Sequence, residues 1–211
     1  VYGRGGSSAR PEGNESLAAL NDLLGRKLPV VVDTSDILYF LRAAALADEF
    51  SLPVVVRGSG AEYQRLDAVR RSGRAVLRPG NFPAPPNVAN AEAAMTVSLE
   101  RLMHWDIAPE NPGRLAAAGV PIALTTDGLK DVGGFLSAVR KAVDRGLTPE
   151  QALQAVTVTP AELFDVDDRY GTIAAGKSAS LVVADGDLFT DAKAKVFEVW
   201  IDGRRYHEHP H

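Results

Sequence analysis

The sequence contains no cysteine, which excludes disulfide bonds, thiolate metal sites and a cysteine nucleophile. It also lacks an apolar run near the ~18–20 residues that a membrane span needs. The longest candidate, residues 37–47, contains Arg42 and is followed by Asp48 and Glu49, as in a soluble helix. A basic excess is missing too, because 23 Lys and Arg face 27 Asp and Glu. We therefore expect neither a membrane nor a nucleic acid as partner.

The composition is that of a folded protein. Hydrophobic residues make up 45% and charged residues 24% of the 211 positions, which excludes disorder as the overall state. This length allows one ordinary domain, or one with a small appendage. Residue 1 is Val, and residues 1–15 resemble a linker rather than a signal or transit peptide. Either processing explains this beginning or the chain starts within a longer protein. The compartment, cytoplasm or periplasm, stays open.

Two similar hydrophobic runs, LPVVVD at 28–33 and LPVVVR at 52–57, predict buried parallel strands and form a weak internal repeat. Further strands are predicted at 75–78 and 120–126. The proline-rich residues 81–88 predict a long loop. Helices are predicted at residues 37–50, 61–71, 91–103, 111–118, 135–145 and from 149 onwards, with a last turn reaching 164. This alternation predicts βα units in a parallel sheet.

The pattern changes after about residue 165, where short strands separated by Gly, Asp and Lys replace the helices. Strands are predicted there at 171–173, 179–184 and 196–201. Asp202-Gly203 is the strongest hairpin-turn signal in the chain. The predicted parts are a linker and helix (1–27), an α/β part (28–165) and a β-strand part (166–211).

Four motifs stand out in the C-terminal half: GVPIALTTDG, AVDRGLTPEQALQAVTVTPAELF, DRYGTIAAGKSASLVVADGD and VWIDGRR. They begin at residues 119, 142, 168 and 199. Together they resemble the amidohydrolase superfamily, close to its imidazolonepropionase-like members. Upstream, residues 28–63 look like the fifth and sixth strand–helix units of such a barrel. Residues 105–120 look like the approach to the eighth strand.

The resemblance implies an α/β fold in two parts. One is the second half of a (β/α)8 TIM-type barrel, with about four parallel strands and their helices. The other is the C-terminal strands of a small composite β-sandwich. By this alignment the chain lacks the first four barrel strands, the family's His-x-His pair and the residue that bridges two metals.

The family hydrolyses C–N and related bonds with one or two divalent metals, such as zinc, bound at the carboxyl ends of the barrel strands. The resemblance implies histidines after the fifth and sixth strands, where this chain has Asp33 and Arg57. Asp33 could ligate a hard cation or cap the following helix. Arg57 offers no lone pair, which favours an ion pair or a loop-anchoring role. We expect no metal or other cofactor in this chain.

Asp127, at the end of the eighth strand, is the one position that keeps the family's catalytic identity. In relatives this carboxylate touches the metal and takes a proton from the attacking water. Asp before Gly128 is also common in turns, so a structural role is the alternative. The resemblance makes Asp127 the catalytic candidate.

The remaining candidate motifs are weaker. His104 is expected to pack or to lie on the surface. The terminal histidines are expected to belong to a tail without preorganised metal geometry; they are His207, His209 and His211. Gly58-Ser59-Gly60 is too short for a dinucleotide-binding loop. Gly133-Gly134 could bind an anion before a helix, although a hinge is favoured.

Two functions remain. The first is the C-terminal part of a hydrolase acting on amide or cyclic amide bonds of a small-molecule substrate, with this chain alone metal-deficient and inactive. The second is a degenerate binding or structural module of a larger protein. Four barrel strands would leave two open edges and an apolar inner face. We therefore expect self-association, as a homo-oligomer, or a missing N-terminal half as partner.

Overall fold

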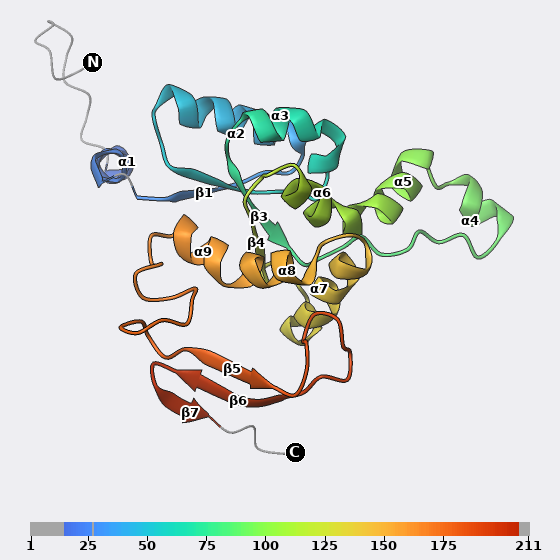
Figure 1. Cartoon of the computed structure of the whole chain (residues 1–211). Coiled ribbons are helices and arrows are strands. Elements are labelled where there is room, and N and C mark those ends of the chain that lie inside the picture. Colours follow the sequence, from blue (N-terminus) through green and yellow to red (C-terminus); the bar gives the residue numbers. More distant parts are fainter. Residues whose placement is uncertain (1–14, 27, 207–211) are drawn as a thin grey trace, which may run out of the picture.

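The computed structural model describes residues 15–26 and 28–206, and within them the strands form two sheets (Figure 1). The larger sheet is parallel, with strands in chain order: β1 (Val30–Asp33), β2 (Val54–Arg57), β3 (Ala75–Pro79) and β4 (Ile122–Thr125). The smaller sheet is antiparallel: β5 (Leu181–Ala184), β6 (Val196–Ile201) and β7 (Arg204–Tyr206). This combination matches half of a TIM barrel with a small β-part, and it confirms the predicted fold class.

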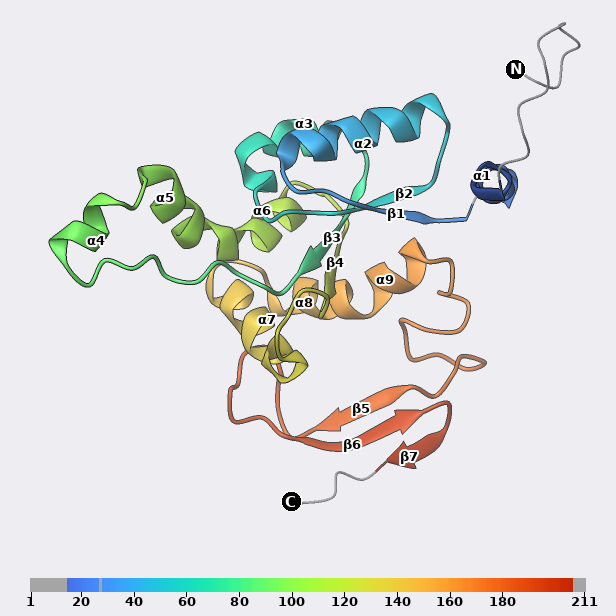
Figure 2. The same cartoon turned by 180° about the vertical axis from the view of Figure 1, so that it is seen from behind.

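One helix precedes the parallel sheet, and the other helices follow its strands. In chain order, the helices are α1 (Glu15–Arg26), α2 (Ile37–Glu49), η1 (Glu62–Arg65), α3 (Leu66–Arg71), α4 (Ala91–Met95), α5 (Leu99–Ile107), η2 (Ala108–Glu110), α6 (Asn111–Ala117), η3 (Val132–Gly134), α7 (Phe135–Asp144), α8 (Pro149–Val156) and α9 (Val158–Leu163). Seen from behind, α2 and α3 lie along β1 and β2, and the small sheet lies beyond α7, α8 and α9 (Figure 2). No helix of the described residues is long and apolar enough to span a membrane.

Alternate residues of the parallel strands face opposite sides, as strand geometry requires. Val56, Val76 and Ile122 belong to the main core, together with helix residues such as Phe40 and Leu115. The residues between them on each strand point to the other face, away from this core. The internal repeat lies in register, because each residue of β1 pairs with its counterpart in β2. Strand-end side chains of the repeat therefore lie next to each other.

Local signals explain several element boundaries. Asp36 caps α2, accepting from the backbone N–H groups of Leu38 and Tyr39 at 2.8 and 3.0 Å. The Tyr39 N–H is the main reason why the pKa of Asp36 lies below its ordinary value. Thr148 and Gln151 form a reciprocal capping box at the start of α8. Such caps are readable from sequence because each involves residues within one helical turn.

Two predicted elements are wrong. The helix predicted over 91–103 breaks between α4 and α5, because Ser98 is extended and its Oγ accepts from the Arg101 N–H (3.2 Å). The strand predicted at 171–173 does not form. There Gly171 has φ +89°, and a Cβ on it would lie 2.9 Å from that of Ala161, so packing against α9 dictates a turn. The irregular loop at 81–88 is confirmed. The part boundaries at 27 and 165 stay predictions.

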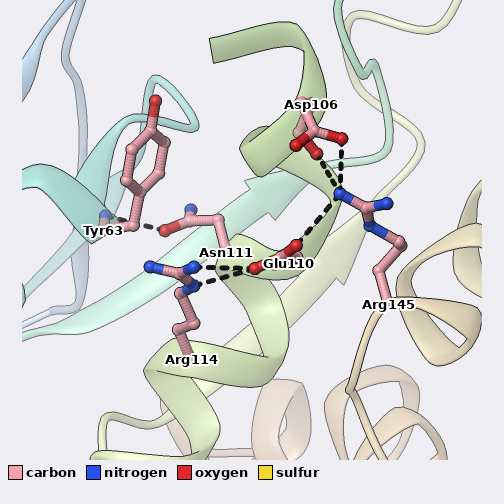
Figure 3. Close-up of polar contacts among 6 residues, drawn as sticks. All are labelled: Tyr63, Asp106, Glu110, Asn111, Arg114 and Arg145. Carbon is pink, nitrogen blue, oxygen red and sulfur yellow. Dashed lines mark hydrogen bonds and ion pairs between the residues drawn. The ribbon is translucent and has the colours of Figure 1, made fainter. Parts of the chain in front are cut away.

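An ion-pair network ties the end of α7 to the helices before β4. Arg145 Nη2 donates to Asp106 Oδ1 at 2.8 Å and to Glu110 Oε1 at 3.0 Å, while Glu110 also pairs with Arg114 (Figure 3). The hydrogen bond to Asp106 is the main cause that raises the pKa of Arg145. The turn between α7 and α8 is thereby held against α5 and η2.

Candidate functional site

Three charged side chains meet at the carboxyl ends of β1, β2 and β4. Arg57 Nε contacts Asp127 Oδ2 and lies 3.7 Å from Asp33 Oδ1. Asp33 and Arg57 are paired residues of neighbouring strands, and their side chains lie on the face away from the helix-packed core. The structure thus brings together the three residues that the sequence placed at separate strand ends, with the guanidinium between two carboxylates.

Solvent reaches this cluster. The side chains of Asp33 and Asp127 are 74% and 61% exposed, against 25% for Arg57. Exposed ion pairs contribute only ~0–1 kcal/mol to stability. The Arg57 Nε contact also lacks hydrogen-bond alignment, so it is an electrostatic pairing only. The cluster therefore determines the charge at this end of the sheet and contributes little to the stability of the fold.

Other predicted residues are placed as follows. Asp33 does not cap α2, since Asp36 does. The His104 ring stacks with that of Tyr63, and its Nδ1 lies 3.1 Å from the Tyr63 hydroxyl. Gly133-Gly134 belong to η3, which leads into α7 and is capped by Asp131. The terminal histidines lie outside the described residues; they are His207, His209 and His211.

Sequence reasoning missed a buried polar network on the helix side of the sheet. Glu62 is fully buried, and its carboxylate accepts from Asn111 Nδ2 at 2.6 Å and from the Gly60 N–H at 3.0 Å. Asn111 Oδ1 in turn accepts from the Tyr63 N–H at 2.9 Å (Figure 3). The short Gly58–Gly60 loop thus wraps a buried carboxylate instead of a ligand. A glutamate two residues after a glycine loop gave no sequence signal of burial.

Arg78 is a buried cation beside this network, with its guanidinium close to Gly60. It is 2% exposed, and burial lowers the pKa of its guanidinium, while the charge of Glu62 opposes that shift and the nearby Arg57 reinforces it. Its guanidinium also lies 5.4 Å from the centre of the Phe82 ring. The negative charge of Glu62 therefore favours the charged form of Arg78.

Comparison with known proteins shows which family and which solved structures this chain resembles. The model of the amidohydrolase family matches residues 110–206. An imidazolonepropionase of Flavobacterium psychrophilum is 33% identical over 94 residues, and an adenine deaminase of Moorella thermoacetica is 38% identical over 76 residues. A solved amidohydrolase from Thermotoga maritima superposes on 95% of the chain, with a TM-score of 0.73 and 25% identity. The C-terminal part of this chain is thus similar to the amidohydrolase family, and its fold resembles that of a solved amidohydrolase.

The amidohydrolase relatives are longer than this chain. The alignments cover 42% of the chain but 23% of the imidazolonepropionase, and 36% of the chain but 12% of the adenine deaminase. In the Thermotoga structure the chain accounts for 49% of the polypeptide. It therefore spans about half of that solved relative.

The strand-end residues do not fit the divalent metal of an amidohydrolase. In the part of the chain that the structure describes, no group of three His, Cys, Asp or Glu side chains could hold a metal ion. Two carboxylates are present, but Arg57 stands between them, and a guanidinium has no lone pair and repels a cation. The position where the family places an imidazole therefore carries a fixed positive charge.

Proposed function

We propose that this chain is the C-terminal half of an amidohydrolase whose C–N bond hydrolysis requires a complementary half, and that the chain alone is inactive and free of tightly bound metal. The observation that carries the proposal is the Arg57 guanidinium paired with Asp127 and close to Asp33. Asp127 remains the catalytic candidate, and its carboxylate is neutralised by Arg57 rather than by a metal ion.

The Arg57–Asp127 ion pair also favours the second function, a binding or structural module that keeps the fold but has no catalytic activity. A hydrolytic metal site lowers the pKa of its bound water by concentrating positive charge on the ion. Arg57 supplies positive charge without an open coordination position, so it can neutralise Asp127 but cannot activate water. The small-molecule substrate, an amide or cyclic amide, would belong to the assembled protein.

Metal analysis tests the proposal. The purified chain, dialysed and measured by elemental mass spectrometry, is expected to hold far less than one divalent ion per chain. A variant with His207, His209 and His211 changed to Ala removes metal bound by the terminal imidazoles. One tightly held ion in that variant would overturn the proposal.

Replacing Arg57 gives the complementary experiment. Arg57→His removes the repelling charge and adds a ligand beside Asp33 and Asp127, so zinc affinity is expected to rise at least tenfold, because imidazole is a good zinc ligand. Arg57→Gln removes the charge without adding a ligand and is the matched control. Equal zinc affinities in the Arg57→His variant and the parent chain would show that Arg57 does not block a metal site.

We further propose that a second copy of the chain, or the complementary half, covers the free face of the parallel sheet. Within the described residues β1 and β4 are its edges, and Val31, on the face away from the core, is 43% exposed. Open edges and exposed apolar residues favour association.

Sedimentation at several concentrations tests association. The chain alone is expected to form dimers or larger species, and Val31→Lys is expected to weaken this association several-fold. Leu38→Lys, at a position 54% exposed on α2, is the matched control and is expected to change nothing. A folded monomer at every concentration would contradict the proposal.

A further inference from the structure

A pocket of about 590 Å³ opens at the carboxyl ends of β3 and β4. We call it the β3–β4 pocket; it is lined by residues 80–83, residues 128–130 and one side of α7. Gly128 lines it and directly follows Asp127, and a Cβ on Gly128 would lie 3.2 Å from Arg57 Nη2. The pocket therefore adjoins the strand-end ion pair without containing it.

Among the described residues, lysines provide the only charged side chains that line the β3–β4 pocket. Lys130 comes from the loop after β4 and Lys141 from α7, and no Asp or Glu is among the lining residues. Within residues 15–26 and 28–206 neither lysine takes part in an ion pair. Two uncompensated positive charges thus face one cavity.

Neighbouring carboxylates do not neutralise these lysines. Asp127 is paired with Arg57, and Glu62 compensates Arg78. Asp131, which follows Lys130 in the chain, accepts a hydrogen bond from the Gly133 N–H at 2.9 Å and forms no ion pair with either lysine among the described residues. Arg57 and Arg78 therefore each lie near an acid, whereas Lys130 and Lys141 form no ion pair with a described residue.

The lining also offers neutral donors and an apolar wall. The Asn81 side chain lies beside Gly128, because a Cβ on Gly128 would be 3.1 Å from Asn81 Nδ2. Neither Asn81 nor Ser137 has a side-chain hydrogen bond to a described residue. The Phe82 ring lines the same pocket, 5.5 Å from Lys141 Nζ. Cations and free donors around an aromatic ring suit an anion attached to a small organic body.

We propose that the β3–β4 pocket binds the anionic group, a carboxylate or a phosphate, of a small organic molecule. Lys130 and Lys141 supply the charge, the Asn81 amide and the Ser137 hydroxyl donate hydrogen bonds, and Phe82 contacts the apolar part. The inference needs no metal, and it concerns ligand binding rather than hydrolysis. It therefore stands apart from the proposed function.

Calorimetric titration of the full chain with inorganic phosphate and, separately, with succinate tests this at constant ionic strength. Saturable binding of either probe is expected, and the tighter probe identifies the anionic group. Lys130→Gln and Lys141→Gln are each expected to weaken binding by about fivefold, the upper range for one exposed charge interaction. The double variant is expected to bind neither probe measurably.

Lys193→Gln is the matched control, because it removes the same charge from the turn before β6, away from the pocket lining. It is expected to leave binding unchanged. Absence of saturable binding of both probes would overturn the proposal. So would an equal loss in Lys193→Gln and Lys141→Gln, since binding would then follow net charge alone.

Discussion

Glu62→Ala is expected to lower the free energy of unfolding by about 3–5 kcal/mol, because it leaves a buried positive charge without the opposite charge near it. The substitution leaves Arg78, which is 2% exposed, without its compensating carboxylate. It also removes the acceptor of Asn111 Nδ2 and of the Gly60 N–H. Urea denaturation at neutral pH measures the loss.

A double-mutant cycle separates the effect of the lost Glu62 charge from the effect of the cavity that the shorter side chain leaves. Arg78→Met combined with Glu62→Ala removes both charges, so the double variant is expected to be more stable than the sum of the single effects predicts, by about 1–3 kcal/mol. Glu92→Ala, at an exposed position in α4, is the surface control and is expected to lie within about 0.5 kcal/mol of the parent chain. Strict additivity would mean that Glu62 and Arg78 are not coupled.

Gly113→Ala is expected to destabilise the chain by about 2–3 kcal/mol, as overpacked substitutions do. Gly113 lies in α6, where alanine would by helix propensity alone be favourable by up to ~1 kcal/mol. A Cβ there would lie 2.7 Å from the carbonyl carbon and oxygen of Gly146 and 2.8 Å from the nitrogen of Leu147. These are backbone atoms, and Arg145 holds their turn against Asp106 and Glu110 (Figure 3).

Gly25→Ala is the matched control, because Gly25 is also helical and nothing lies within 4 Å of its Cβ position. It is expected to be neutral or slightly stabilising. Thermal denaturation of both variants checks the pair. If Gly113→Ala were as stable as Gly25→Ala, the close approach of α6 to the α7–α8 turn would not constrain the fold.

The candidate site was only partly predictable from sequence. Asp33, Arg57 and Asp127 each end a hydrophobic run, and parallel strands place their carboxyl ends at one edge of a sheet. An ion-pair role was among the interpretations of Arg57, but its partners depend on register between strands that are distant in the chain. Glu62 and Arg78 gave no such signal, because their burial follows from how η1 and α6 pack on the sheet.

The sequence by itself determined the succession of strands and helices, the α8 capping box, and the hairpin turn at Asp202-Gly203, where both residues have positive φ. Each depends on hydrophobic periodicity or on residues within one turn of chain. Tertiary structure decided the turn at Gly171 and the place of Arg57 between two carboxylates. These depend on contacts between distant segments, whose distances and charges exist only once the sheet and its helices have packed.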